Sequence, residues 1–139
     1  MPFVLDASVA VCWAFEDEDH PVAALSLERV RADEARVPSL WWFEVRNTLI
    51  VNERRGRLRE SDTAAFLRAL ARLNVTIDRS PDEADVLALA RRRQLTVYDA
   101  AYLELARRER LELATLDTAL ATAARAERAP LLGERRQGD

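Results

Sequence analysis

The chain has 139 residues, of which 49% are hydrophobic and 32% are charged, and its formal net charge is −3. This length can bury one sizeable core, and the acidic balance does not by itself indicate a nucleic-acid-binding protein. All 21 basic residues are arginine and only three residues are glycine. The composition therefore excludes sites that need a lysine or a glycine-rich phosphate loop.

The termini and the single cysteine indicate a cytoplasmic protein. No apolar run reaches the roughly 18 residues that a membrane span needs, and no basic segment precedes the first apolar residues, as it would in a signal peptide. Cys12 stands alone, which excludes an internal disulfide and suits a reducing compartment. Its apolar surroundings predict a small core residue, and the only histidine, His20, is expected to be a solvated loop residue.

The apolar pattern predicts strands that alternate with helices along one chain. Strands are expected over 2–6, 35–39, 75–80 and 111–116, with a short one over 129–132 and an apolar segment over 95–98. Helices are expected over 7–16, 20–34, 40–57, 60–74 and 80–93, from Asp99, and from Asp117 or Thr118. In the helix over 80–93, Ser80 is the expected N-cap with Pro81 in the first position.

Strands separated by helices predict a three-layer α/β/α sandwich with a central, mostly parallel sheet. In such sheets, sites form outside the carboxyl ends of the strands. Asp6 and Asp117 each follow a predicted strand at that end. We therefore expect these two carboxylates to lie close together.

Four acids stand in apolar segments, and each has a structural alternative. Asp6, Asp99 and Asp117 precede helical segments, where aspartate is a common N-cap. Glu44 lies in mid-helix on an apolar stripe, where the alternative is a partner such as Arg46 of a neighbouring subunit. Taken together, clustered acids would repel one another strongly, by roughly 4 kcal/mol for two charges about 4 Å apart at an effective dielectric constant of about 20. A bound Mg²⁺ or Mn²⁺ ion would neutralise such an all-oxygen cluster.

Four segments resemble PIN-domain ribonucleases, and most closely the VapC-type toxins of toxin–antitoxin modules. These segments are LDASVAVCWAFEDE, VPSLWWFEVRNTL, LTVYDAAYLELARR and LATLDTAL, and they follow one another in the order and spacing of that family. The resemblance covers nearly the whole chain, which predicts a single PIN domain over 1–134 and a polar tail over 135–139. The four acids of the family fall on Asp6, Glu44, Asp99 and Asp117.

The resemblance implies a Mg²⁺- or Mn²⁺-dependent endoribonuclease, the toxin of a type II toxin–antitoxin system. Asp6 and Asp99 are the expected direct metal ligands, with Asp117 binding a second ion or the first one through water. Glu44 would orient the attacking water or complete a second metal site. The hydroxyls of Ser8 and Thr115 would support the carboxylates from outside the coordination sphere.

The resemblance also implies RNA as the substrate, a VapB-type antitoxin and a second copy of the chain as partners, and no membrane. The aromatic residues Trp41, Trp42 and Phe43 cannot all be buried on one helix face, so at least one is expected to contact a partner, with ordinary core packing as the alternative. The arginine runs over 52–59 and 90–94 either contact phosphates or form a solvated face. Two other functions remain open: a non-catalytic PIN-like module that binds RNA or protein, and a phosphatase that uses Asp6 as nucleophile.

Overall fold

A four-stranded parallel sheet forms the centre of the protein in a computed structural model that describes residues 1–134. The predicted polar tail, 135–139, lies outside the described residues. The strand order is β3-β2-β1-β4, so β1 is paired with β2 on one side and with β4 on the other. The strands are β1 (Phe3–Leu5), β2 (Ala35–Pro38), β3 (Val75–Asp78) and β4 (Glu112–Ala114).

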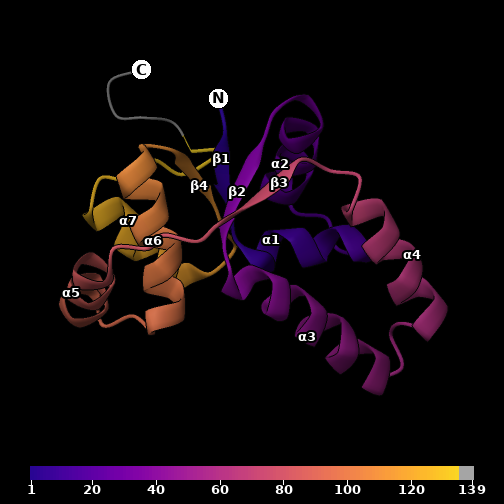
Figure 1. Cartoon of the computed structure of the whole chain (residues 1–139). Coiled ribbons are helices and arrows are strands. Elements are labelled where there is room, and N and C mark those ends of the chain that lie inside the picture. Colours follow the sequence, from indigo (N-terminus) through magenta and orange to yellow (C-terminus); the bar gives the residue numbers. More distant parts are fainter. Residues whose placement is uncertain (135–139) are drawn as a thin grey trace.

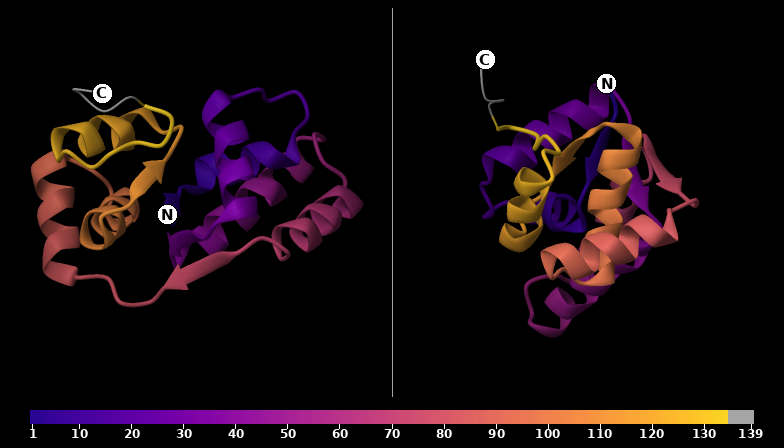
Figure 2. Two further views of the ribbon diagram at one scale, coloured as in Figure 1. Left: turned by 90° about the horizontal axis from the view of Figure 1, so that it is seen from above. Right: turned by 90° about the vertical axis from the view of Figure 1, so that its left-hand side faces the viewer.

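Helices cover both faces of this sheet, which confirms the predicted α/β/α sandwich. Figures 1 and 2 show the first four helices on one side of the strands and the last three on the other. The first group is α1 (Ala7–Ala10), continued by the 3-10 helix η1 (Val11–Ala14), then α2 (Pro21–Ala32), α3 (Leu40–Arg54) and α4 (Glu60–Leu70). The second group is α5 (Glu83–Arg93), α6 (Val97–Glu109) and α7 (Thr118–Ala126).

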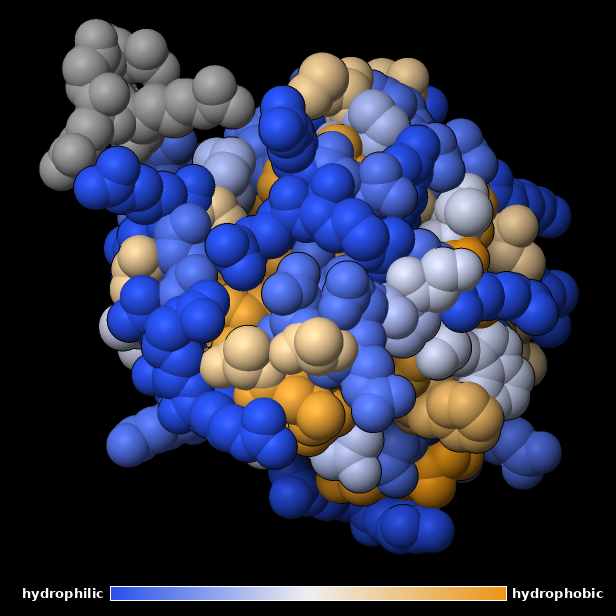
Figure 3. Space-filling view, turned by 60° about the vertical axis from the view of Figure 1, so that its left-hand side comes forward, coloured by the Kyte–Doolittle hydropathy of each residue, from blue (hydrophilic) through white to orange (hydrophobic). Residues whose placement is uncertain are grey.

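The core lies between the sheet and these two helical layers. All three residues of β1 are fully buried, as a strand with both faces covered requires. Cys12 is buried in the same core, as predicted, and burial raises the pKa of its thiol to about 12. Figure 3 brings the α5–α7 side forward and shows strongly hydrophilic side chains over much of that face, with hydrophobic surface between them.

Two helix starts differ from the prediction because of their capping residues. Asp82, not Ser80, is the N-cap of α5, and its carboxylate accepts a hydrogen bond from the Asp85 backbone N–H at 3.1 Å. Thr96 is the N-cap of α6, so the helix includes part of the apolar segment 95–98. The predicted strand over 129–132 is reduced to a single parallel bridge between Leu113 and Leu131.

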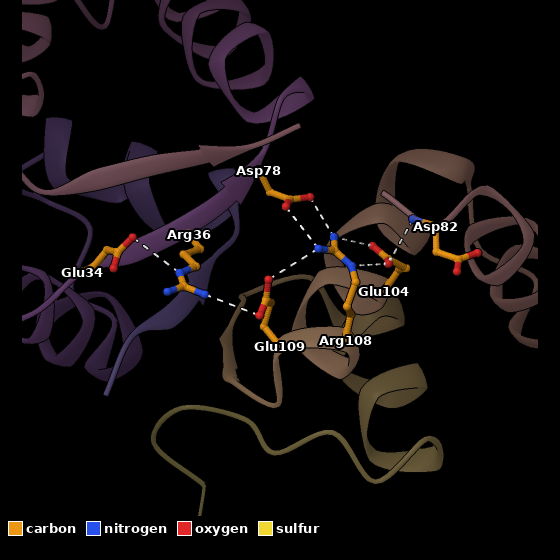
Figure 4. A network of polar contacts seen from close by, with 7 residues as sticks. All are labelled: Glu34, Arg36, Asp78, Asp82, Glu104, Arg108 and Glu109. Atoms are coloured by element: carbon orange, nitrogen blue, oxygen red, sulfur yellow. Dashed lines mark hydrogen bonds and ion pairs between the residues drawn. The ribbon is translucent and has the colours of Figure 1, made fainter. Parts of the chain in front are cut away.

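Arg108 fixes the position of α6 against its neighbours (Figure 4). Its guanidinium makes two hydrogen bonds to Asp78 at the end of β3, at 2.7 and 3.2 Å, and two to Glu104, at 2.7 and 3.1 Å. Glu104 is only 2% exposed, and it also accepts from the Asp82 backbone N–H at 3.2 Å. Because paired forks of this kind are geometrically specific, the network fixes the C-terminal half of α6 against the end of β3 and the start of α5.

Within residues 1–134, no helix combines the length and apolar character needed to cross a bilayer.

Candidate active site

Asp6 and Asp117 lie at the carboxyl ends of two neighbouring strands. Asp6 directly follows β1, and Asp117 comes three residues after β4, whose Ala114 pairs with Leu5. The chain moves from β1 to β2 on one side and reaches β4 on the other, so the adjacent carboxyl ends of β1 and β4 mark the topological switch point of the sheet. Ligands of open α/β sheets bind at such points, and the predicted meeting of these two ends is confirmed.

Asp6 is buried and held by two hydroxyl groups. Ser8 Oγ and Thr115 Oγ1 both donate to Asp6 Oδ2, each at 2.7 Å. The same two hydroxyls accept hydrogen bonds from the backbone N–H groups of Leu116 and Asp117, each at 3.0 Å. Within residues 1–134, Asp6 Oδ1 accepts no side-chain hydrogen bond. Ser8 and Thr115 therefore fix one oxygen of the carboxylate and leave the other without a side-chain hydrogen bond in the described part of the chain.

The pKa of Asp6 is raised, first by burial and also by the negative charge of Asp117, although the two hydroxyl hydrogen bonds lower it. Asp117 is itself the N-cap of α7, where its Oδ1 accepts from the Leu120 backbone N–H at 2.8 Å. The capping interpretation of Asp117 is thus confirmed. It does not compete with a role in the site, because one carboxylate oxygen serves the cap while the charge acts on its acidic neighbours.

Asp99 lies in the first turn of α6 and does not cap it. The capping group is Thr96 Oγ1, which accepts from the Asp99 backbone N–H at 3.0 Å, so the N-cap alternative for Asp99 is wrong. The pKa of Asp99 is raised to about 6, chiefly by burial and also by the negative charges of Asp117 and Asp6. Within residues 1–134, its carboxylate makes no hydrogen bond or ion pair.

Glu44 joins the other acids from α3 on the opposite side of the sheet. Its carboxylate is half-buried and accepts a hydrogen bond from the Tyr102 hydroxyl at 2.6 Å. Burial raises the pKa of Glu44, as do the charges of Asp6 and Asp99, whereas the hydrogen bond from Tyr102 lowers it. The partner of Glu44 is therefore Tyr102. Within one chain Arg46 does not pair with it, because its guanidinium lies 3.9 Å above the Trp42 ring.

Tyr102 is the site residue that the sequence reasoning missed. It stands three positions after Asp99, on the same face of α6, a spacing that by itself is typical of core packing. The side chain is indeed fully buried, but its hydroxyl reaches the acid cluster. A buried tyrosine hydroxyl normally needs a partner, and this rule could have linked Tyr102 to the unpaired Glu44.

The four predicted acids thus form one electrostatically coupled group without a cationic partner. Charges of the group raise the pKa values of Asp6, Asp99 and Glu44, and no arginine pairs with any of the four within residues 1–134. No three of them offer oxygens that all lie within 4.8 Å of one another in this part of the chain. An ion held by two carboxylates and water would suit this spacing, since Mg²⁺ commonly keeps several water ligands.

The fold and the group of four acids define a class, and comparison of the sequence with known families agrees. The chain matches the PIN domain over residues 3–126 and belongs to this family. It is 35% identical over 124 residues to Ribonuclease VapC3 from Pyrobaculum aerophilum, a match that covers 87% of this chain and 93% of that protein. The chain is therefore a PIN-domain protein of the VapC type, as the sequence resemblance predicted.

Solved structures show the same fold. PAE2754 from Pyrobaculum aerophilum superposes with a TM-score of 0.71 at 23% identity, covering 88% of this chain and 84% of that one. A toxin–antitoxin complex from Klebsiella pneumoniae superposes with a TM-score of 0.56 at 22% identity, covering 84% of this chain and 87% of that one.

Proposed function

We propose that this protein is a divalent-metal-dependent endoribonuclease and the toxin of a toxin–antitoxin pair. The observation that carries the proposal is the group of four acids that lies at the switch point of the sheet and has no arginine partner within residues 1–134. The likeness of the chain to Ribonuclease VapC3 supports RNA as the substrate. Clustered carboxylates with raised pKa values are typical of functional sites.

The donor set fits a hard cation. The four acids and the two hydroxyls of Ser8 and Thr115 offer only oxygen atoms, which favour Mg²⁺ or Mn²⁺ over zinc. Asp6 and Asp99 would hold the ion, and Asp117 would contact it through water or hold a second one. When bound, the ion lowers the pKa of a water molecule and neutralises charge on the phosphate.

The chain's own groups would position the reactants. The hydroxyls of Ser8 and Thr115 keep Asp6 Oδ2 in place, so that its other oxygen is presented to the ion. Tyr102 holds Glu44 by one oxygen, leaving the second to orient the attacking water and accept its proton. Because the pKa of Glu44 is raised, it lies closer to neutral pH, which suits a general base.

Partners are expected on the exposed aromatic end of α3. Trp41 is buried, but Trp42 is 44% exposed and Phe43 is 68% exposed, as the crowding of three aromatic residues on one helix predicted. Their rings pack edge to face at 5.0 Å beside Glu44 in the sequence. We infer that this aromatic surface contacts a protein partner, either the antitoxin or a second copy of the chain.

Metal dependence is the direct test. Protein freed of metal with EDTA and checked by elemental analysis should not cleave RNA, and Mg²⁺ or Mn²⁺ should restore cleavage. Full cleavage by the metal-free protein would contradict the proposal. Binding of RNA without cleavage under every metal condition would favour the non-catalytic alternative.

A further inference from the structure

A second group of ligating side chains lies apart from the four acids. It consists of Cys12 in η1 and of Glu18 and His20 in the loop that leads to α2. The Cys12 sulfur, a Glu18 carboxylate oxygen and a His20 ring nitrogen all lie within 4.8 Å of one another. In the described part of the chain, no other three cysteine, histidine or acidic side chains meet this closely.

The local fold brings these three residues together before any ion arrives. Cys12 points into the protein and donates to the Ser8 carbonyl oxygen at 3.3 Å. The chain leaves η1 at the extended residue Phe15 and begins α2 at Pro21. Trp13 Nε1 donates to the Ala23 carbonyl oxygen at 2.8 Å, which ties η1 directly to α2. The loop is thus closed at both ends, and little entropy remains to be lost when its side chains bind an ion.

His20 has no other task in the described structure. It occupies the N-cap position of α2, where serine, threonine, aspartate or asparagine is usual, and its side chain makes no capping hydrogen bond. No other hydrogen bond or ion pair engages its imidazole within residues 1–134. The His20 side chain is exposed to solvent, whereas Cys12 is buried. Both imidazole nitrogens are therefore open to an ion that enters from solvent.

We propose that Cys12, Glu18 and His20 bind a Zn²⁺ ion, with its fourth position open to water. A mixed set of sulfur, nitrogen and oxygen donors suits zinc, whereas Mg²⁺ prefers oxygen alone. Zinc ligands lie about 2.0–2.3 Å from the ion, so the three atoms need only a small inward movement to share one. Cys12 binds as the thiolate, and its proton is released to solvent.

Arg57 limits the affinity of this site. Its guanidinium lies 4.2 Å above the Phe15 ring, and Nη2 contacts Glu18 Oε1 at 3.3 Å and Asp17 Oδ2 at 3.6 Å. This positive charge occupies one oxygen of Glu18 and leaves the other for the ion. Bound zinc would join η1 to the loop one helical turn from Ser8, whose hydroxyl supports Asp6. The ion would therefore stabilise the folded protein next to the acid site without belonging to it.

Cobalt distinguishes the two sites, because only a cysteine ligand gives a sulfur-to-metal charge-transfer band. The full chain, kept reduced with a thiol-free reductant, should develop this band when titrated with Co²⁺. Stoichiometric Zn²⁺ should remove it, and excess Mg²⁺ should not. Zn²⁺ should also raise the melting temperature.

Variants of each ligand test the geometry. Cys12→Ser should abolish the band, while His20→Ala and Glu18→Gln should weaken Co²⁺ binding by at least about tenfold, the lower end of the loss seen for outer partners of metal sites. His20 is exposed, so its substitution leaves the core intact. Asp99→Asn is the matched control and should keep the band unchanged. Absence of a band at saturating Co²⁺, or a band insensitive to both His20→Ala and Glu18→Gln, would overturn the proposal.

Discussion

The two ends of α6 lie in opposite electrostatic surroundings. Near its start, Asp99 has acidic neighbours and no cation, and the pKa of its carboxyl is raised to about 6. Beyond its end, Glu127 accepts hydrogen bonds from Arg92 at 2.8 and 2.9 Å and also pairs with Arg93, and the hydrogen bond with Arg92 is the main cause that lowers its pKa to about 2. The difference separates charges that the fold neutralises from charges that it leaves for a ligand.

The arginine-rich end is explained by the fold alone. α5, α6 and α7 all carry arginines in their last turns, where positive charge offsets the helix dipole. A hollow of about 980 Å³ lies there, lined in part by Arg107, Arg110, Arg125 and Arg128 together with Glu127 and Glu134. Arg92 and Arg93, from the run over 90–94, pair with Glu127. These two arginines therefore make ion pairs within the protein, and whether the run contacts phosphates stays a prediction.

Asp99→Asn should have the largest effect on activity and show the acid end at its most sensitive. The change keeps the size of the side chain and removes a charge that a metal ligand must supply. We expect RNA cleavage to fall by at least about a hundredfold. Losing a group that only hydrogen-bonds a metal ligand already costs about 10–100-fold, and losing a ligand itself should cost no less. Because repulsion among the acids also falls, the metal-free protein should melt at the same or a higher temperature, and Mg²⁺ should stabilise it less.

Asp82→Asn is the matched control for that variant. Asp82 caps α5 outside the acid cluster, and asparagine caps about as well as aspartate. Activity and stability should both stay near those of the unmodified protein. Retained cleavage in Asp99→Asn would remove Asp99 from the metal site, and a collapse of its stability would show that the two ends do not differ as argued.

Ser8→Ala should weaken the site without changing any acid. It removes one of the two hydroxyls that hold Asp6 Oδ2, and we expect the affinity for Mg²⁺ or Mn²⁺ to fall about 10–100-fold. Isothermal titration measures this directly. Ser26→Ala is the control, because Ser26 is buried in α2 and donates to the Val22 carbonyl oxygen. An equal loss of metal affinity in both variants would mean that the Ser8 effect is merely structural.

Glu127→Gln should reverse the pattern and cost stability with little loss of activity. It removes the charge that holds Arg92 and Arg93, at a cost on the order of 1–2 kcal/mol once solvent screening is considered. Urea unfolding gives this value, and Glu134→Gln, which breaks one exposed pair with Arg125, should cost less than about 0.5 kcal/mol. A large loss of cleavage in folded Glu127→Gln would contradict the separation of the two ends.

Tyr102→Phe should have a smaller effect at the acid end. The lost hydrogen bond to Glu44 should cost about 0.5–1.5 kcal/mol of stability. Since this bond lowers the pKa of Glu44, its removal should move the acidic limb of the pH–rate profile to higher pH. Tyr98→Phe, at a tyrosine that is 64% exposed, should change neither quantity. An unmoved pH profile would leave Tyr102 as a core residue only.

The pH dependence of stability should carry both signatures in one curve. Asp99 has a folded pKa near 6, above its ordinary value of 3.8, so the folded protein binds more protons between these values and stability falls as the pH rises through them. Glu127 has a folded pKa near 2, below its ordinary value of 4.5, so its contribution is lost as the pH falls through that range.

The metal-free protein should therefore be most stable near pH 4, where the two windows overlap between 3.8 and 4.5. Thermal unfolding across pH 2–8 measures the curve. Asp99→Asn should flatten the upper limb and Glu127→Gln the lower one. A stability curve that rises steadily from pH 4 to 8 would contradict a raised pKa for Asp99 in the folded protein.

The sequence alone determined the layers of the fold and the four acids. Strands that alternate with helices along the chain form a parallel sheet with helices on both faces. Acids that follow these strands lie at the carboxyl edge of the sheet. The places of Asp6 and Asp117 followed from this, whereas the inward position of Glu44 and the exposure of part of the aromatic run followed from helix geometry. Gly56, with a φ of +76°, lies just past the end of α3, where a left-handed conformation favours glycine, so the helix is shorter than the predicted 40–57.

Only the tertiary structure decided which side chains partner these acids. The contact of Tyr102 with Glu44 spans 58 residues of sequence, and no local pattern specifies such a distant pair. The support of Asp6 by Thr115, across 109 residues, was implied only by the family resemblance. Helix starts also depended on hydrogen bonds, because Thr96 and Asp82 captured backbone N–H groups that several nearby polar residues could have capped. The meeting of Cys12 with Glu18 and His20 likewise arose from how one loop closes between two packed helices.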